Sequence, residues 1–182
     1  MEHGYSQQQC WIFGYGSLLW NPGFPFIEQH PAKVHGYHRS LCILSHKYRG
    51  TFEKPGLVLG LDNEGACHGM VFRIAPENVK EVLVYLDQRE QVTKVYCPIQ
   101  VSALCQNGET VKALTYVVRK NHEQYVQLSP QKQAQLVSQG VGSRGSALEY
   151  LSNTLHQLNV LGIEDTPLST VLKLAQNCSV KS

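Results

Sequence analysis

Apolar residues alternate with polar ones, or gather in β-branched and aromatic runs, in several short stretches between Trp11 and Val118. Such stretches are typical of strands. We expect strands over residues 11–13, 33–44, 57–61, 66–74, 95–104 and 110–118. The turn Asp62–Gly65 is expected to join the third strand to the fourth as a tight hairpin, and the Asn107-Gly108 pair to join the last two. Both hairpins predict antiparallel pairing.

Apolar residues at helical spacing predict further elements. After Pro76 they recur every three or four positions, which indicates a helix over residues 76–90. Start signals at Ser129-Pro130 and Thr166-Pro167 indicate more helices. These are expected near 130–139, 146–158 and 167–176, with a glycine-rich spacer at 140–145. Strands that precede helices, without regular β-α-β alternation, indicate an α+β fold with a mainly antiparallel, barrel-like sheet and flanking helices.

The length of 182 residues fits a single domain, which we place over residues 10–178 after a polar, flexible segment at residues 1–9. Hydrophobic residues make up 42% of the chain and charged residues 16%, as in an ordinary globular protein. The 16 basic and 14 acidic residues are scattered, which excludes a basic stripe suited to nucleic acid or to an anionic membrane. The sequence leaves the oligomeric state open.

The first residues lack the basic and apolar parts of a signal peptide, and no apolar run approaches the ~20 residues of a membrane helix. We therefore expect a cytoplasmic protein. The six cysteines form no Cys-x-x-Cys pair, and several lie in apolar segments such as residues 41–44. Reduced, buried thiols fit that compartment, and none of them stands out as a nucleophile.

A carboxylate occupies a core position at the end of the first predicted helix. Val79, Leu83 and Leu86 form an apolar stripe, and the next position of that stripe is Glu90. Burial and the negative end of the helix dipole both disfavour a second negative charge, so this carboxyl group suits a general base or acid near neutral pH. Whether the neighbouring Arg89 offsets this effect stays open, because it lies about 100° round the helix. The alternative is a frayed helix end, with Glu90 in water or paired with a lysine.

A glycine loop, Gly14-Tyr15-Gly16-Ser17-Leu18, follows the first predicted strand. Its glycines leave backbone N–H groups unscreened, and Tyr15 and Ser17 add hydrogen-bonding side chains. A loop of this kind can bind a carboxylate or a developing oxyanion. The alternative is a tight structural turn around a buried tyrosine.

Several common sites are excluded because essential residues are missing. The Gly-Tyr-Gly run lacks the third glycine of a dinucleotide-binding loop, since residue 19 is leucine. The sequence contains no Gly-Lys-Ser/Thr phosphate loop and no Gly-x-Ser-x-Gly nucleophile elbow. His35 and His38 would project to opposite faces of a strand, an arrangement that does not suit a metal site. The residues thus indicate neither a metal nor a cofactor.

Four segments, taken in chain order, resemble the ChaC-like γ-glutamylcyclotransferases, the glutathione-specific branch of the γ-glutamylcyclotransferase superfamily. They are FGYGSLLWNP, YRGT followed by KPG, YLDQRE and LEYL. The resemblance implies a γ-glutamylcyclotransferase-like fold and an enzyme that requires no cofactor. Its substrate would be a small molecule, glutathione or a related γ-glutamyl peptide. In that reaction the α-amine of the γ-glutamyl residue attacks its own γ-carbonyl, which gives 5-oxoproline and, from glutathione, Cys-Gly.

The resemblance also implies roles for individual residues. Glu90, the glutamate of the Arg-Glu pair, would be the catalytic general base and acid. The glycine loop would hold the γ-glutamyl group, and an arginine and two tyrosines elsewhere would contact the substrate. These substrate-binding residues are Tyr15, Gly16, Ser17, Leu18, Arg49, Tyr96 and Tyr150.

Three positions depart from the family pattern. Leu57 stands where many members have arginine, Lys94 where glycine is common, and Ala147 where asparagine is usual. Because the absence of polar groups away from the reacting centre alters substrate preference, a cyclotransferase for other γ-glutamyl amines or dipeptides is one alternative. A regulatory binding protein that uses the same pocket without turnover is another, although a pure binder does not require a carboxylate such as Glu90.

Overall fold

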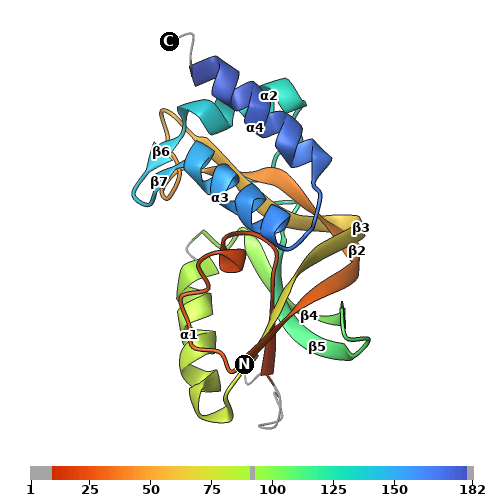
Figure 1. The fold of residues 1–182 in the computed structure, drawn as a ribbon. Helices are drawn as coiled ribbons and strands as arrows, with labels where there is room; N and C mark the ends of the chain where they lie inside the picture. Colours follow the sequence, from red (N-terminus) through yellow and green to blue (C-terminus); the bar gives the residue numbers. More distant parts are fainter. Residues whose placement is uncertain (1–9, 91–92, 180–182) are drawn as a thin grey trace. The chain divides into compact units, whose positions relative to one another are not determined.

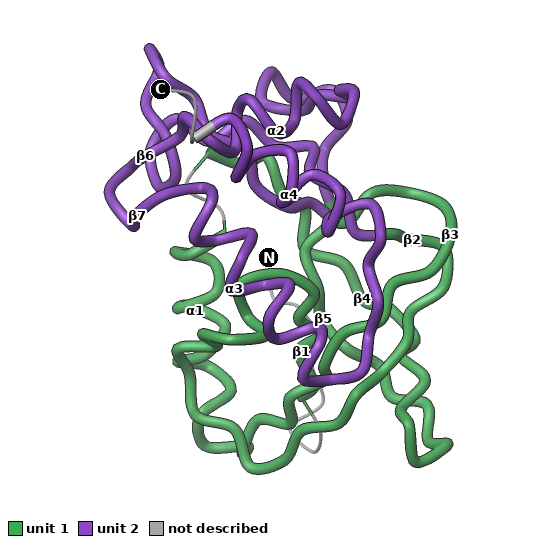
Figure 2. Tube along the Cα trace, turned by 45° about the horizontal axis from the view of Figure 1, so that its top comes forward, with its two compact units in different colours: residues 1–38, 61–117 green, residues 39–60, 118–182 purple. Residues whose placement is uncertain are grey.

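The computed structural model describes residues 10–90 and 93–179, and the chain divides into two compact units that interleave in sequence (Figure 2). Unit 1 is Met1–His38 with Leu61–Val117, and unit 2 is Arg39–Gly60 with Val118–Ser182. The expected flexible segment at residues 1–9 lies outside the described residues. The single domain over residues 10–178 stays a prediction.

A closed barrel of five strands, in the order β1-β3-β2-β4-β5, is the main sheet (Figure 1). The strands are β1 (Cys10–Gly14), β2 (Glu28–Ser45), β3 (Gly56–Ile74), β4 (Tyr96–Cys105) and β5 (Thr110–Val118). β1 pairs antiparallel with β3, and β2 pairs antiparallel with β4. A parallel pair closes the barrel, with Ile12 of β1 opposite Leu114 of β5. The predicted α+β fold with a barrel-like, mainly antiparallel sheet is confirmed.

Helix α1 (Val79–Glu90) follows β3 through a 3₁₀ turn at Pro76–Asn78, where proline starts the helical segment as predicted. The ring of Phe24, from the loop after β1, meets Phe72 of β3 and Tyr85 of α1 edge-on. The ring centroids are 5.8 Å and 6.3 Å apart, distances at which aromatic edges and faces attract. One aromatic side chain therefore joins the loop, the helix and the barrel wall within unit 1.

Three helices contact one another in unit 2 (Figure 1): α2 (Pro130–Gln139), α3 (Ala147–Val160) and α4 (Thr166–Ser179). Ser129 and Ser146 cap α2 and α3 through side-chain oxygens that accept backbone N–H groups. The predicted glycine-rich spacer forms a two-stranded ribbon, β6 (Val141–Gly142) with β7 (Gly145–Ser146). The helices expected here are confirmed to within a few residues at each end. None of the helices in the described ranges has the length and apolar character to cross a membrane.

The six cysteines are free, and the prediction that they are buried is confirmed for four of them and wrong for Cys178. Four of them are buried, namely Cys10, Cys42, Cys67 and Cys105, while Cys97 is half-buried and Cys178 is exposed. Burial raises the pKa of the Cys10 and Cys105 thiols above the ordinary value. A raised thiol pKa lowers the thiolate fraction near neutral pH, so these two cysteines are poor nucleophiles.

The hairpin predicted around Asp62–Gly65 is wrong, because β3 runs without interruption through this segment. Glu64 and Gly65 have φ angles of 76° and 78°, the left-handed conformation that a tight turn requires at its two central residues. His38 of β2 donates from Nδ1 to the carbonyl oxygen of Asn63 at 3.0 Å. The turn residues thus adopt turn-like angles within one long strand, which lies between β1 and β2 in the barrel.

Replacing Glu64 with glycine tests the cost of that local conformation. We expect Glu64→Gly to raise the free energy of unfolding by about 0.5 kcal/mol, since glycine avoids the Cβ clash at positive φ but increases chain entropy in the unfolded state. The matched control, Glu109→Gly, lies outside the positive-φ residues and should lower stability by about 0.5–1 kcal/mol. Urea unfolding measures the change in the free energy of unfolding for each variant. A change of the same sign in both would contradict the conclusion that the backbone conformation of Glu64 costs stability.

Candidate active site

The glycine loop leaves the end of β1 and closes into a 3₁₀ turn at Ser17–Leu19. The Leu19 N–H donates to Gly16 O at 3.0 Å, and the Asn21 N–H donates to Ser17 O at 2.8 Å. Because the first acceptor of this turn is Gly16 O, the N–H groups of Ser17 and Leu18 precede its hydrogen-bond ladder. The turn therefore aims two adjacent backbone donors away from its own carbonyl groups.

Tyr15 fixes the start of this loop to the barrel. Its side chain is buried, and its hydroxyl donates to the backbone oxygen of Tyr116 on β5 at 2.9 Å. A second hydrogen bond joins β1 to β5 next to this one: the Thr115 hydroxyl donates to Phe13 O at 3.0 Å. The structural role that the sequence left open for Tyr15 is therefore present, and its hydroxyl proton is committed to β5.

Glu90 is the last residue of α1, and its side chain is 18% exposed. The most deeply buried positions of the helix are Val82 and Leu86, so Glu90 continues an i, i+4 row of core residues. This differs in detail from the predicted stripe, because Leu83 is half-buried while Val82 is in the core. The alternative of a frayed, solvated carboxylate is wrong, whereas the catalytic role of Glu90 stays a prediction.

Arg89 is the site residue that sequence reasoning missed. Its side chain is 8% exposed, and its Nη2 donates to Ser17 Oγ at 2.8 Å. Nη1 donates to the carbonyl oxygens of Asn21 and Pro22 at 2.8 Å and 2.9 Å. Nε lies 3.4 Å from Oε1 of Glu90. One guanidinium group thus connects the glycine loop to the carboxylate at the helix end.

Tyr85, one helical turn before Arg89, completes this cluster. Nη1 of Arg89 donates to the Tyr85 hydroxyl oxygen at 2.9 Å. Gly23, which follows the 3₁₀ turn in the loop after β1, has a φ of +73°. A Cβ atom at this position would lie 2.1 Å from the Tyr85 oxygen. The Asn-Pro-Gly turn therefore needs glycine for two reasons, its backbone angle and the close approach of Tyr85. The sequence does contain a signal for this cluster. A tyrosine and an arginine four positions apart precede the glutamate at the helix end.

Arg49 and Tyr150 form a second cluster, which lies within unit 2. The Arg49 guanidinium lies over the Tyr150 ring at 5.4 Å, and the Tyr150 hydroxyl accepts the Leu59 N–H at 3.3 Å. Nη1 of Arg49 donates to Ser146 O at 3.3 Å and lies 4.0 Å from the Glu149 carboxylate.

The Arg49 side chain is 11% exposed, whereas that of Glu149 is 62% exposed. Burial lowers the pKa of the Arg49 guanidinium below its ordinary value, while Tyr150 and Glu149 act in the opposite direction. A nearly buried cation with a distant, solvated counter-ion can gain from a further anionic partner.

Backbone hydrogen bonds hold the segment that carries Arg49. The N–H groups of Ser143 and Arg144 donate to the carbonyl oxygens of Lys47 and Tyr48, both at 2.9 Å. The ribbon β6-β7 therefore fixes the predicted polar loop that contains the YRGT motif. Tyr96, the remaining predicted contact, is half-buried and is the first residue of β4 in unit 1.

The three departures from the family pattern occupy distinct environments. Leu57 and Ala147 are fully buried in unit 2, and their side chains carry no polar group. Lys94 has a φ of 59°, the left-handed conformation for which glycine is favoured. The polar contacts that other residues would supply at the first two positions are therefore absent from this chain.

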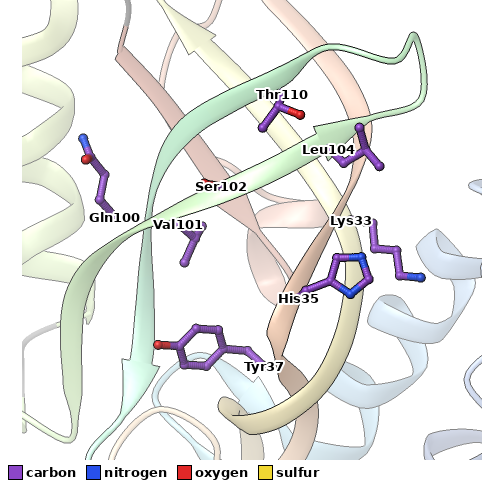
Figure 3. Close-up of a pocket in the computed structure, with 8 residues that line it drawn as sticks. All are labelled: Lys33, His35, Tyr37, Gln100, Val101, Ser102, Leu104 and Thr110. Atoms are coloured by element: carbon purple, nitrogen blue, oxygen red, sulfur yellow. The ribbon is translucent and has the colours of Figure 1, made fainter.

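A separate pocket of about 430 Å³ lies on unit 1, over β2, β4 and β5 (Figure 3). Its lining residues are Lys33, His35, Tyr37, Gln100, Val101, Ser102, Leu104 and Thr110. None of the predicted catalytic or substrate-binding residues is among them. The two histidines of His-x-x-His also separate, since His35 lines this pocket while His38 bonds to Asn63.

A protein-family model described as ChaC-like protein matches residues 10–178. The chain belongs to the ChaC-like family. This ChaC-like chain is 33% identical, over 163 residues, to the glutathione-specific γ-glutamylcyclotransferase of Escherichia coli strain K12, covering 89% of this chain and 71% of that protein. It is 34% identical, over 151 residues, to human glutathione-specific γ-glutamylcyclotransferase 1, covering 79% and 67%. The resemblance indicated by the motifs is confirmed.

A solved structure shares the fold. The crystal structure of a γ-glutamyl cyclotransferase specific to glutathione from yeast matches with a TM-score of 0.84. The two chains are 22% identical, and the match covers 93% of this ChaC-like chain and 96% of the yeast chain. The predicted γ-glutamylcyclotransferase-like fold is thereby confirmed.

Gly23 offers a direct test of the packed loop. Gly23→Ala should lower the free energy of unfolding by about 2–4 kcal/mol, because the added methyl collides with the Tyr85 hydroxyl and φ is positive. Gly108→Ala is the matched control: its φ is +90°, and a Cβ atom there would meet no atom within 4 Å. This control should lose about 1 kcal/mol. Equal losses in urea unfolding would show that the contact with Tyr85 contributes nothing.

Proposed function

We propose that this ChaC-like protein is a glutathione-specific γ-glutamylcyclotransferase that converts glutathione to 5-oxoproline and Cys-Gly. The observation that carries this proposal is the largely buried Glu90 carboxylate, joined through Arg89 to Ser17 of the glycine loop. An acid–base group and a set of hydrogen-bond donors thus meet in one cluster. The relatives from Escherichia coli and human, both named for this activity, support the same assignment.

The proposed reaction requires one group that first accepts and then donates a proton. The α-ammonium of the γ-glutamyl residue must lose a proton before its nitrogen attacks the γ-carbonyl carbon. The attacking nitrogen loses a second proton as the lactam forms, the bond from that carbon to the leaving amine breaks, and the amine nitrogen gains both protons and leaves as an ammonium group. Glu90 can perform both transfers in turn, so no second acid, water or cofactor enters the reaction. Cleavage of a carbon–nitrogen bond without water makes the enzyme a lyase.

The glycine loop has the second task, which is to hold the γ-glutamyl chain folded so that its amine reaches its own carbonyl. Positioning of reacting groups lowers a barrier by several kcal/mol. The Ser17 and Leu18 N–H groups, which precede the hydrogen-bond ladder of the turn, are suited to the α-carboxylate or to the tetrahedral oxyanion. Gly16, the N-cap residue of the turn, has no side chain that could cover these donors.

The remaining predicted residues receive roles that fit their contacts. The hydroxyl proton of Tyr15 is committed to Tyr116 O, so Tyr15 serves the substrate by fixing the loop. Arg49 and Tyr150 form a cation–aromatic pair suited to a substrate carboxylate. Tyr96 is assigned to substrate contact through the family resemblance. A cytoplasmic location is part of the proposal and fits the free cysteines.

A broader substrate range is the second candidate. Leu57 and Ala147 are fully buried and supply no polar contact for the Cys-Gly part of glutathione. Fewer contacts away from the reacting centre would allow other γ-glutamyl amines or dipeptides to compete. The same Glu90 and glycine loop would serve in both cases, so the leaving amine is the point of difference.

Replacing Glu90 with glutamine tests the proposed base. We expect Glu90→Gln to fold normally and to lower kcat by at least about 100-fold, because the amide keeps the shape and cannot accept the proton. Formation of 5-oxoproline and Cys-Gly from reduced glutathione is followed by mass spectrometry. Glu81→Gln, on the exposed face of the same helix, is the matched control and should keep wild-type turnover.

The outcomes separate the candidate functions. Full turnover by Glu90→Gln would remove Glu90 from the mechanism. Turnover of γ-glutamyl dipeptides with none of glutathione would favour the broader cyclotransferase, and wild-type protein that binds glutathione but releases no product would favour a regulatory binding protein.

Tyr150→Phe tests the second cluster. The variant keeps the ring beneath Arg49 and loses the hydroxyl that accepts the Leu59 N–H, so we expect kcat/KM for glutathione to fall about 10-fold. Tyr37→Phe, in the separate pocket of unit 1, is the control and should change kcat/KM less than about twofold. Identical kinetics for the two variants would contradict a substrate-binding role for the Tyr150 hydroxyl.

A further inference from the structure

We propose that Arg89 is a positioning residue that holds the Ser17 hydroxyl and the Glu90 carboxylate in the single arrangement needed for turnover. This inference rests on the proposed cyclotransferase function. It assigns no chemistry to Arg89 itself, because the contacts of the guanidinium are with protein groups.

The first support is how the guanidinium uses its three nitrogens. Nη2 bonds to Ser17, Nη1 serves the loop carbonyl groups and Tyr85, and Nε faces Glu90. A planar, rigid fork fixes the directions of these contacts relative to one another. Moving the loop or the carboxylate independently would therefore disrupt hydrogen bonds on the other side of the same group.

The second support is burial. The Arg89 side chain is 8% exposed and that of Glu90 is 18% exposed, so neither charge is fully solvated. Loss of one partner of a largely buried ion pair leaves the other charge without compensation. Arg89 therefore supplies the positive charge beside the proposed base. The sequence alone did not show whether Arg89 lies close enough to Glu90 to do so.

The third support is the direction of the bond to Ser17. A guanidinium has donors and no acceptor, so Ser17 Oγ must accept this hydrogen bond. The Ser17 hydroxyl proton is then directed to a different acceptor, and no protein acceptor for it is found among residues 10–90 and 93–179. Arg89 thus orients Ser17 as a hydrogen-bond donor, and the acceptor that fits is an oxygen of the γ-glutamyl substrate.

Lysine is the informative replacement for Arg89. Its ammonium keeps a positive charge at this helix end, but one nitrogen cannot face the loop, Tyr85 and Glu90 in the same fixed directions. Arg73→Lys is the matched control, because Arg73 lies in the same unit and also contacts a carboxylate. Its Nε lies 2.6 Å from Oε2 of Glu28, and Glu28 has no proposed role. An effect that any arginine-to-lysine change at an ion pair of this unit produces would appear in both variants.

A double-mutant cycle with Ser17→Ala measures the coupling during glutathione turnover. We expect kcat/KM to fall about 100-fold in Arg89→Lys and about 10-fold in Ser17→Ala. The double variant should fall about 100-fold, because the two changes remove the same arrangement. Ser17→Ala and Arg73→Lys should instead combine multiplicatively. A loss of about 1000-fold in the Arg89–Ser17 double variant, or wild-type kinetics in Arg89→Lys, would overturn the inference.

Amide hydrogen exchange provides a readout that is independent of activity. Arg89→Lys should increase exchange in the loop at residues 15–22 more than Arg73→Lys does, and Tyr85→Phe should do so to a smaller extent. Equal exchange in Arg89→Lys and the control would overturn the positioning role. If wild-type protein turned over no glutathione, the proposed function would fail, and this exchange measurement alone would decide whether Arg89 holds the loop.

Discussion

A buried guanidinium must find acceptors for its N–H groups, and Arg89 satisfies this constraint with atoms from two parts of unit 1. The loop after β1 supplies carbonyl and hydroxyl oxygens, and α1 supplies Tyr85 and Glu90. Because the cation is removed from water, these acceptors cannot be exchanged for solvent without cost. The position of the loop and the position of the helix end therefore depend on each other.

The same constraint explains why the loop is rich in small residues. A glycine at position 23 allows Tyr85 to approach the backbone, and the 3₁₀ turn at Ser17–Leu19 brings a hydroxyl to Arg89 while its first N–H groups stay available. The hydrogen-bond donors that we propose for the substrate and the carboxylate that we propose for proton transfer thus lie in one cluster. A γ-glutamyl group, which carries an α-amine, an α-carboxylate and a γ-carbonyl, has the complementary chemistry.

Arg49, in unit 2, is a second arginine that is largely buried. Its contacts are one long hydrogen bond to Ser146, a solvated carboxylate and the face of Tyr150. All three nitrogens of Arg89 face protein acceptors, whereas Arg49 donates to a single backbone carbonyl oxygen and can gain from an added anion. This contrast explains why we assign a positioning role to the first arginine and a substrate-binding role to the second.

The sequence by itself determined the helices, most strands, the carboxylate at the end of α1 and the glycine loop, because period, caps and turn residues are local properties of the chain. Tertiary structure decided what local patterns do not contain. Pairing with neighbouring strands converted a predicted hairpin at Asp62–Gly65 into one continuous strand. Long-range hydrogen bonds committed the Tyr15 hydroxyl to β5 and brought Arg89 to Ser17, 72 positions apart in sequence. Such contacts depend on which surfaces meet after folding, and no pattern along the chain encodes them.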